Sequence, residues 1–324
     1  MGVPYADLGR SFGPRRIREA SSSSRFSHYA TISDLVALHA AARDMRFAGR
    51  GRTQSLLPAR ADRRSNGAPA NLGLEARSLS TLPAPRRPRA PSSDGLPAPV
   101  LIVVDQRLSM FFGSRRSLKS VAAAEAAALC VWRGLDFGAA VGGVVFNDST
   151  VEPVEPRLGG GAAMQLVRTI ATKNGELRAG SPQPRAPKQL EAALRSKLLA
   201  RAGGCNIVVV SDFEGHCAST RELLREIGSQ NQVLAVCVYD PFLLDLSRAG
   251  DIIVTGGEVQ IDLEFGDGLV RRRLFDLADA QASQALAVER ELGVPVYAVS
   301  AAEDTPPQMR GLLDALCARP DERD

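Results

Sequence analysis

The sequence has few aromatic residues and no long apolar run. Phe, Trp and Tyr make up 5% of its 324 residues, whereas hydrophobic residues as a whole make up 44%, so a core must be built mainly from Ala, Val and Leu. No stretch approaches the ~18 consecutive apolar residues that span a membrane. The N-terminus does not combine a basic region, an apolar segment and a cleavage site. These absences predict a cytoplasmic protein without a membrane span.

The sequence also lacks clustered cysteines. Its five cysteines are scattered, and no Cys-x-x-Cys pair occurs, which argues against a zinc site or a disulfide framework. Cys130 and Cys237 lie in apolar surroundings, which predicts small core residues. His216 and Cys217 are adjacent but have no third catalytic partner nearby in the sequence, so we interpret the pair as incidental.

Nucleotide-binding motifs are missing as well. Neither Gly-x-x-x-x-Gly-Lys-Ser/Thr nor Gly-x-Gly-x-x-Gly follows an expected strand. The lone glycine run Leu158-Gly-Gly-Gly161 is more typical of a flexible turn before a helix. Any ATPase activity would have to come from a partner.

Charge is distributed unevenly along the chain. The formal net charge is +4, with +4 in residues 1–50, +5 in residues 51–99 and −5 in residues 100–324. A nucleic-acid reader would carry its basic stripe within a folded domain, interleaved with aromatic residues. The sequence therefore does not indicate specific nucleic-acid recognition.

Residues 51–99 differ in composition from the rest of the chain. They contain eight Pro and eight Arg but no Val, Ile, Phe, Tyr or Trp, so they cannot bury enough apolar surface to offset the entropy of ordering. We expect four regions: an N-terminal helical arm (1–50), a disordered basic linker (51–99), a folded domain (100–318) and a short tail (319–324).

Alternating strand and helix patterns predict an α/β fold for residues 100–318. Val100–Val104 and Asn206–Val210 are short β-branched runs, typical of strands buried on both faces of a parallel sheet. Helical patterns separate the apolar runs, which predicts a doubly wound, mostly parallel sheet with helices on both faces. The further expected elements are a helix over Ser117–Trp132 with Lys119 and Glu125 facing solvent, a strand over Ala139–Phe146 whose Gly142-Gly143 admits a close helix, an edge strand over Val151–Pro156, a helix over Ala162–Thr172, a helix over Lys188–Ala202, a helix over Ser219–Ser229, a strand over Gln232–Tyr239, a hairpin over Asp251–Glu264, a helix over Phe275–Leu292, a strand over Val294–Ser300 and a helix over Leu312–Ala318.

Polar residues follow both central strands. Asp105 and Ser109 come after the first strand and Asp212 after the other. Ligands bind in the crevice outside the carboxyl ends of such strands. Two carboxylates and a hydroxyl there would form an oxygen-rich pocket of the kind that Mg²⁺ occupies. A plain capping role for Asp105 is the alternative.

These motifs resemble a known family. Asp105-x-x-x-Ser109 with its Ser-Met-Phe-Phe-Gly continuation, and the later Ser211-Asp212-Phe213, are similar to the von Willebrand factor A-like domain of bacterial domain-of-unknown-function family fifty-eight. Tyr239-Asp-Pro241 falls in the same order. The resemblance covers about residues 100–317, with a weaker similarity at 32–43. It implies a von Willebrand factor A-like fold and a MoxR-type AAA+ ATPase as partner, because family members are typically encoded beside such ATPases.

The resemblance also implies a metal motif, from which this chain departs. The family pattern is Asp-x-Ser-x-Ser, a distant Thr and a distant Asp. Here Asp105, Ser109 and Asp212 match, Arg107 replaces the middle serine, and the loop expected to hold the threonine, Leu158–Ala163, has no hydroxyl. Mg²⁺ held by the three matching residues remains one alternative. We favour the other, in which the Arg107 guanidinium pairs with a carboxylate and takes the electrostatic role of the metal.

Two function classes are compatible with these features. The first is a non-enzymatic protein-interaction domain, a partner of a MoxR-type ATPase in protein maturation or complex assembly, with no required cofactor. In it Arg107 would attract a partner's carboxylate directly. The second is a haloacid-dehalogenase-like phosphatase with Asp105 as nucleophile. That chemistry needs an acid two positions later, where Arg107 cannot exchange protons near neutral pH, so the first class is favoured.

The resemblance breaks off between residues 53 and 99. Gly49-Arg-Gly-Arg52 is family-like, but the family segments expected after it are replaced by sequence rich in Arg, Pro, Ala and Ser. Two origins stay open, a shifted reading frame in GC-rich DNA or a lineage-specific linker. The nucleotide sequence of the locus would distinguish them.

Overall fold

The central element of the protein is one six-stranded sheet. The computed structural model describes residues 27–44, 97–178, 185–241, 252–255, 260–263 and 292–317. The strand order is β3-β2-β1-β4-β5-β8. The strands span Val100–Asp105 (β1), Val141–Phe146 (β2), Val151–Arg157 (β3), Asn206–Ser211 (β4), Gln232–Tyr239 (β5) and Val296–Ser300 (β8). The predicted fold class is confirmed.

The two strands predicted to be central occupy the middle of the sheet. β1 pairs in parallel with β2 on one side and β4 on the other, and β5 and β8 continue the parallel pairing. Only β3 runs antiparallel, at the edge beside β2, as its alternating sequence with prolines predicted. All five parallel strands therefore present their carboxyl ends at one edge of the sheet.

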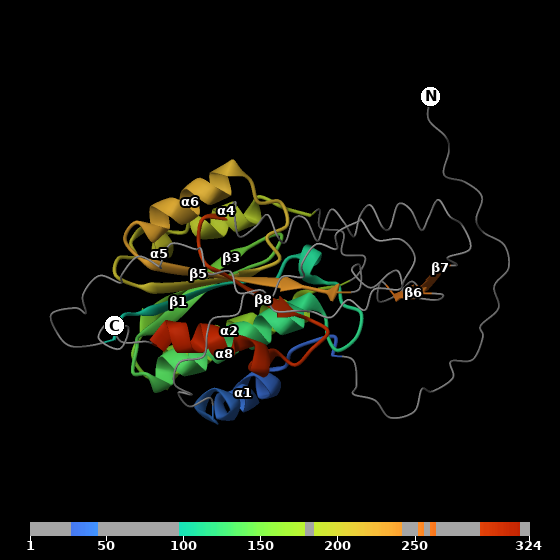
Figure 1. Cartoon of the computed structure of the whole chain (residues 1–324), viewed down its shortest axis with the longest axis horizontal. Helices are drawn as coiled ribbons and strands as arrows, with labels where there is room; N and C mark the ends of the chain where they lie inside the picture. The colour runs from blue at the N-terminus through green and yellow to red at the C-terminus, as the bar shows by residue number, and fades with distance from the viewer. Residues whose placement is uncertain are drawn as a thin grey trace, which may run out of the picture.

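Helices cover both faces of the sheet. The longer ones are α1 (Ile32–Asp44), α2 (Lys119–Asp136), α3 (Gly160–Glu176), α6 (Ala218–Gly228) and α8 (Thr305–Cys317). Three short ones are η1 (Leu108–Met110), α4 (Gln189–Leu194) and α5 (Lys197–Ala200). α2, α3 and α8 pack on one face with α1 outside them, and α4, α5 and α6 pack on the other (Figure 1).

Strand geometry divides the core into two layers. Val100, Ile102 and Val104 of β1 pack under α2, while Leu101 and Val103 face α4 and α6. Successive side chains of a strand point to opposite faces, so a continuous apolar run supplies both layers. Small alanines fill the α2 side, as the low aromatic content predicted.

Helix α1 packs directly on α2. The Trp132 indole Nε1 donates to the Leu35 carbonyl at 2.7 Å, and the Trp132 ring stacks on His39 with centroids 4.8 Å apart. Leu35 and Ala42 are fully buried. The described part of the expected N-terminal arm thus belongs to the same packed unit. Residues 45–96, which include nearly all of the expected linker, lie outside the described residues.

Several local expectations need correction. The helix expected over Lys188–Ala202 is two short helices, because Ser196 caps α5 by accepting from the Leu199 amide at 3.4 Å. At Gly142 and Gly143 the nearest neighbours are strands and not a helix, since a Cβ on either would lie within 2.5 Å of the backbone of β3 or β1. The closing helix begins seven residues earlier than predicted, at Thr305.

The expected hairpin is confirmed in part. β6 (Ile252–Thr255) and β7 (Gln260–Leu263) pair antiparallel as a separate two-stranded sheet. The helix expected over Phe275–Leu292 lies outside the described residues apart from its last position.

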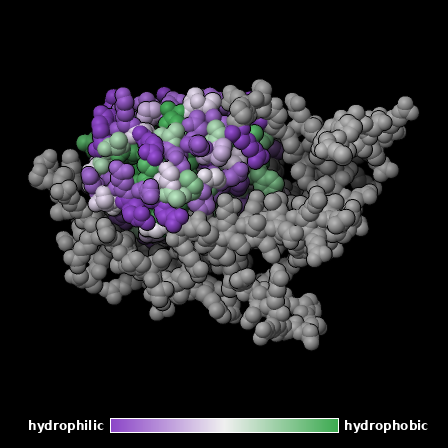
Figure 2. Space-filling model, turned by 90° about the horizontal axis from the view of Figure 1, so that it is seen from above, coloured by the Kyte–Doolittle hydropathy of each residue, from purple (hydrophilic) through white to green (hydrophobic). Residues whose placement is uncertain are grey.

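The face of the protein that carries α4 and α6 is mostly hydrophilic (Figure 2). Figure 2 shows small, scattered hydrophobic spots on it. No helix among the described residues is long and apolar enough to cross a membrane.

Candidate functional site

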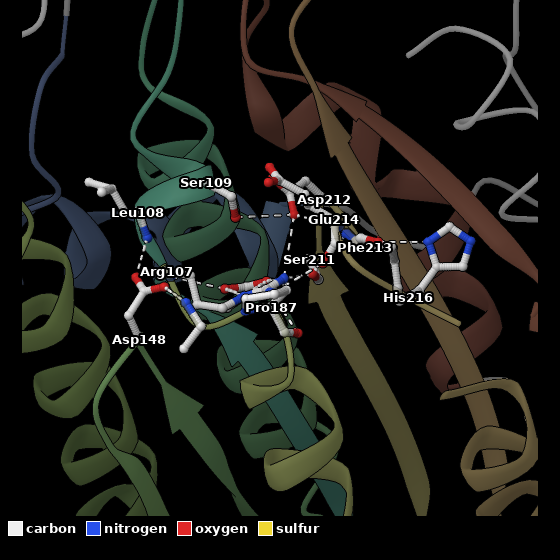
Figure 3. A network of polar contacts seen from close by, with 12 residues as sticks. Arg107, Leu108, Ser109, Asp148, Pro187, Ser211, Asp212, Phe213, Glu214 and His216 are labelled. Atoms are coloured by element: carbon white, nitrogen blue, oxygen red, sulfur yellow. Dashed lines mark hydrogen bonds and ion pairs between the residues drawn. The ribbon is translucent and has the colours of Figure 1, made fainter. Parts of the chain in front are cut away.

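Two carboxylates from the central strands meet at the carboxyl edge of the sheet. Asp105 is the last residue of β1, and Asp212 directly follows β4. Because β1 and β4 are adjacent and parallel, both side chains reach the same crevice, as predicted. Figure 3 shows Asp212 there beside Arg107 and Ser109. Asp105 is completely buried, and the Asp212 side chain is 6% exposed. Ionised groups at such depth need partners.

Arg107 provides the first of these partners. Its Nη2 lies 2.7 Å from Asp105 Oδ2 and 3.6 Å from Asp212 Oδ1, and its Nε donates to Asp105 Oδ1 at 3.0 Å. Its Nη1 donates to the carbonyls of Pro187 and Glu214, both at 3.1 Å. The ion pair predicted for Arg107 is therefore present. The side chain is only 2% exposed, and all three guanidinium nitrogens are engaged within the protein.

Because its guanidinium nitrogens are all engaged within the protein, Arg107 does not match the expectation that it attracts a partner's carboxylate. The guanidinium donates to Asp105 and to the carbonyls of Pro187 and Glu214, and its Nη2 also lies 3.6 Å from Asp212 Oδ1. An incoming carboxylate would have to displace Asp105. In this conformation Arg107 serves the interior of the site, not a partner.

Asp105 is held by further donors. The Ser211 hydroxyl donates to its Oδ2 at 2.6 Å, and the Arg107 amide donates to its Oδ1 at 2.9 Å. Burial raises the pKa of Asp105, although the Arg107 charge and the Ser211 hydroxyl oppose that rise. Both carboxylate oxygens are thus occupied and shielded from solvent, which does not suit a nucleophile that must reach a phosphoester.

Lys119 provides the second cation. Its Nζ lies 2.7 Å from Asp212 Oδ2, and the Ser109 hydroxyl donates more weakly to Asp212 Oδ1 at 3.5 Å. Burial alone would raise the pKa of Asp212, but Lys119 and Arg107 outweigh it and hold that pKa below its usual value. Lys119 and Ser109 are partly exposed, whereas Asp105 and Arg107 are buried.

The expectation that Lys119 and Glu125 face solvent is wrong. Their side chains are 14% and 12% exposed, and the Glu125 carboxylate pairs with Arg116 at 2.9 Å. α2 follows β1, so its first turn lies at the carboxyl edge of the sheet, beside the crevice. That strand-to-helix order was the signal in the sequence that could have placed Lys119 in the site.

Asp148 is a site residue that sequence reasoning missed. It follows β2, the strand on the other side of β1, and it joins two loops (Figure 3). Its Oδ2 accepts from the Leu108 amide at 2.6 Å and its Oδ1 from the Ala186 amide at 2.8 Å. These bonds hold the 185–188 segment against the loop after β1. Its position two residues after the end of a parallel strand was again the available signal.

The loop expected to hold a metal-ligating threonine lies elsewhere. β3 is antiparallel, and its last residue, Arg157, pairs with Val141 at the start of β2. Leu158–Ala163 therefore follows at the amino edge, roughly 17 Å from the crevice at ~3.3 Å per strand residue. The segment that reaches the crevice is the one before α4, through the Pro187 carbonyl.

The geometry does not fit a bound divalent ion beside Arg107. Asp105 and Asp212 direct oxygens at the guanidinium, which fills the space between them. In the part of the chain that the structure describes, no group of three or more His, Cys, Asp or Glu side chains could hold a metal. The matching residues Asp105, Ser109 and Asp212 thus come together, but around an organic cation.

Aromatic residues lie on the chain segments next to the crevice. Phe111 and Phe112 follow η1, and the Phe112 carbonyl accepts from the Lys119 amide at 2.7 Å. Tyr29 precedes α1, and its ring centroid is 6.3 Å from that of Phe111. Tyr29 and Phe112 are 37% and 36% exposed. Tyr29 donates to the Leu177 carbonyl at 3.0 Å, and Arg178 lies over its ring at 5.4 Å. Leu177 and Arg178 also line a hollow of about 310 Å³ that extends to Asp148. We call Tyr29, Phe111, Phe112 and Arg178 the aromatic rim.

Comparison with solved structures gives distant similarities. The protein BatB from Bacteroides thetaiotaomicron aligns at 16% identity and a TM-score of 0.40, covering 68% of this chain and 98% of BatB. An aerotolerance-related membrane protein from Bacteroides fragilis aligns at 16% identity and a TM-score of 0.33, covering 60% of this chain and 98% of its own.

Curated relatives are closer in sequence. The uncharacterized proteins Mb1516 of Mycobacterium bovis and Rv1480 of Mycobacterium tuberculosis are each 28% identical over 209 residues, which is 63% of this chain. The chain spans 62% of the length of these relatives. Residues 97–284, more than half of the chain, match the family described as protein of unknown function DUF58. The chain therefore belongs to the DUF58 family, as the motifs around Asp105 and Asp212 indicated.

Proposed function

We propose that this protein is a non-enzymatic interaction domain that binds a MoxR-type AAA+ ATPase through the carboxyl edge of its sheet. The observation that carries the proposal is the pairing of an exposed aromatic rim with an ion-pair cluster whose charges are already matched. Aromatic residues and Arg are enriched in protein interfaces and dominate their energetics. The choice of ATPase rests on the resemblance and on the gene neighbourhood typical of the family.

The charges of the crevice support binding without chemistry. Asp105 pairs with Arg107 and Asp212 with Lys119, so two anions face two cations. Catalytic acids, bases and nucleophiles must touch the reacting atoms. The buried Asp105–Arg107 pair is closed off from a substrate, whereas the partly exposed Ser109 and Lys119 can form hydrogen bonds with a protein surface.

We also propose a cytoplasmic location, because the proposed ATPase partner would be found there.

The test is a binding measurement with a matched pair of variants. Phe112→Ser removes an apolar side chain from the aromatic rim, and Leu158→Ser removes one that is 58% exposed at the opposite edge of the sheet. Affinity for the purified MoxR-type ATPase encoded nearest the gene would be measured by biolayer interferometry. We expect Phe112→Ser to weaken binding by about tenfold or more, equivalent to ~1.4 kcal/mol. Leu158→Ser should bind as wild type does.

Two outcomes would contradict the proposal. If wild type does not bind the ATPase, the partner is wrong. If both variants bind equally to wild type, the interface lies away from the aromatic rim. A parallel assay with p-nitrophenyl phosphate should show no turnover, and turnover that disappears in Asp105→Asn would identify an enzyme instead.

A further inference from the structure

The polar partners of the Arg107 guanidinium are all oxygen atoms, and the Phe146 ring lies against it, with its centroid 5.7 Å from the guanidinium carbon. These partners are the carboxylates of Asp105 and Asp212 and the main-chain carbonyls of Pro187 and Glu214. These oxygens form a shell and come from the ends of two strands and from two loops (Figure 3). Carboxylate and carbonyl oxygens are the donors that hard divalent cations take. The shell thus has the composition of a cation site, with an arginine side chain in it.

The position of Phe213 helps to build this shell. Its φ is +56°, a backbone conformation that bulky side chains rarely adopt. The Phe213 amide donates to the Ser211 hydroxyl at 2.9 Å, and the ring is fully buried. The turn at Phe213 leads directly to Glu214, whose carbonyl faces Arg107. An unusual backbone conformation persists only when surrounding contacts hold it, as the hydrogen bond and the buried ring do here, so the shell is a fixed part of the structure.

The charge of the shell requires a cation. Without Arg107 the buried carboxylates of Asp105 and Asp212 would face Lys119 alone. Two neighbouring carboxylates repel each other, and an uncompensated buried charge is strongly destabilising. A guanidinium is permanently charged and cannot dissociate from the chain. It also lies within hydrogen-bond distance of the Asp105 oxygens, so a metal ion cannot share them.

We propose that Arg107 is a tethered cation occupying a divalent-cation cavity, so that the wild-type protein neither needs nor binds Mg²⁺ there, and that shortening this side chain opens the cavity to Mg²⁺. The proposal is independent of the ATPase partnership, because it concerns the occupant of the shell and not the aromatic rim.

The experiment is a thermal unfolding series on the full chain with MgCl₂ or EDTA. Wild type should melt at the same temperature in both. Arg107→Ser removes the guanidinium and adds a hydroxyl oxygen, so it should melt lower in EDTA. Saturation of the opened site should then raise its melting temperature by about 2 °C or more. Isothermal titration calorimetry should detect Mg²⁺ binding to Arg107→Ser and not to wild type.

Three further variants complete the test. Arg201→Ser removes a surface arginine, 69% exposed, and should not respond to Mg²⁺. Arg107→Ser combined with Asp212→Asn lacks a carboxylate of the shell and should lose the Mg²⁺ response. Arg107→Lys keeps a tethered cation, so its melting temperature should be the same in MgCl₂ and EDTA; this variant tests the role of the tethered charge if Arg107→Ser does not fold. The proposal would be overturned if wild type binds Mg²⁺, or if Arg107→Ser folds but its melting temperature does not respond to Mg²⁺. It would also be overturned if the melting temperature of Arg107→Lys depends on Mg²⁺.

Discussion

The two edges of the sheet contain arginine–carboxylate pairs of similar length and very different surroundings. At the carboxyl edge, Arg107 and Asp105 are 2.7 Å apart with side chains 2% and 0% exposed. At the amino edge, Arg201 and Glu155 are 3.1 Å apart with side chains 69% and 55% exposed. Water solvates the second pair whether or not it forms, but it cannot reach the first. Burial, more than distance, therefore decides how much the fold depends on each pair.

The largest expected effect concerns the arginines themselves. Arg107→Met should lower the free energy of unfolding by about 3–5 kcal/mol, because it leaves Asp105 buried without its counter-ion. Arg201→Met should lower it by at most about 1 kcal/mol. Urea unfolding of both variants beside wild type measures the difference. Similar losses in the two variants would show that the edges do not differ in this respect.

A smaller effect is expected from two asparagines, one at each edge. Asn174 is fully buried; it accepts from the Ala30 amide at 2.7 Å and donates to the Gln106 side chain at 2.9 Å. Asn174→Ala should cost about 1–3 kcal/mol, because the partners it leaves are closed to water. Asn231, which bonds to the Cys205 amide at 3.0 Å, is partly exposed, so Asn231→Ala should cost less. Chemical denaturation compares the two, and a larger loss for Asn231→Ala would contradict the expectation.

The smallest expected effect appears only in acid. The pKa of Asp212 is lowered in the folded protein, so its stabilising contribution is present above the unfolded value of about 3.9 and is lost as pH falls through the folded value. The pKa of Asp105 is raised in the folded protein, so its contribution to the free energy of unfolding changes with pH in the opposite direction. Asp212→Asn should therefore flatten the fall in stability below about pH 4.

Asp304→Asn is the control for that measurement. Asp304 pairs with Arg116 at 2.8 Å, but its side chain is 78% exposed, so solvent screens this pair far more than the buried pair of Asp212. Unfolding curves between neutral and acidic pH should change with pH in this variant as in wild type. An unchanged pH profile in Asp212→Asn would mean that the ion pair with Lys119 does not stabilise the fold.

Much of the fold could be predicted because its central strands correspond to short runs of β-branched residues in the sequence. Val100–Val104 and Asn206–Val210 are apolar at nearly every position, which suits only strands covered on both faces. The break between α4 and α5 was harder to foresee, since Ser196 lies within an otherwise helical pattern. The close approach of strand backbone to the glycines of β2 was not foreseen, because a sequence does not show which backbone will lie beside them.

The site could be predicted only in part. Asp105 and Asp212 follow parallel strands, so their meeting follows from the order of strands and helices. The glycine loop at Leu158 was placed wrongly because a single antiparallel strand, β3, reverses the direction of the chain before it. Asp148 and Lys119 were missed although each lies close to the end of a parallel strand or the start of the helix after it.

The sequence by itself determined the α/β class, the central pair of strands and the meeting of Asp105 with Asp212, because these depend on local patterns and on the shared direction of parallel strands. Only the tertiary structure decided which cations meet which carboxylates. Lys119 and Asp212 are 93 residues apart, and Arg107 and the Pro187 carbonyl are 80 apart. Contacts over such separations depend on how helices and loops pack on the sheet, and no local pattern records that packing.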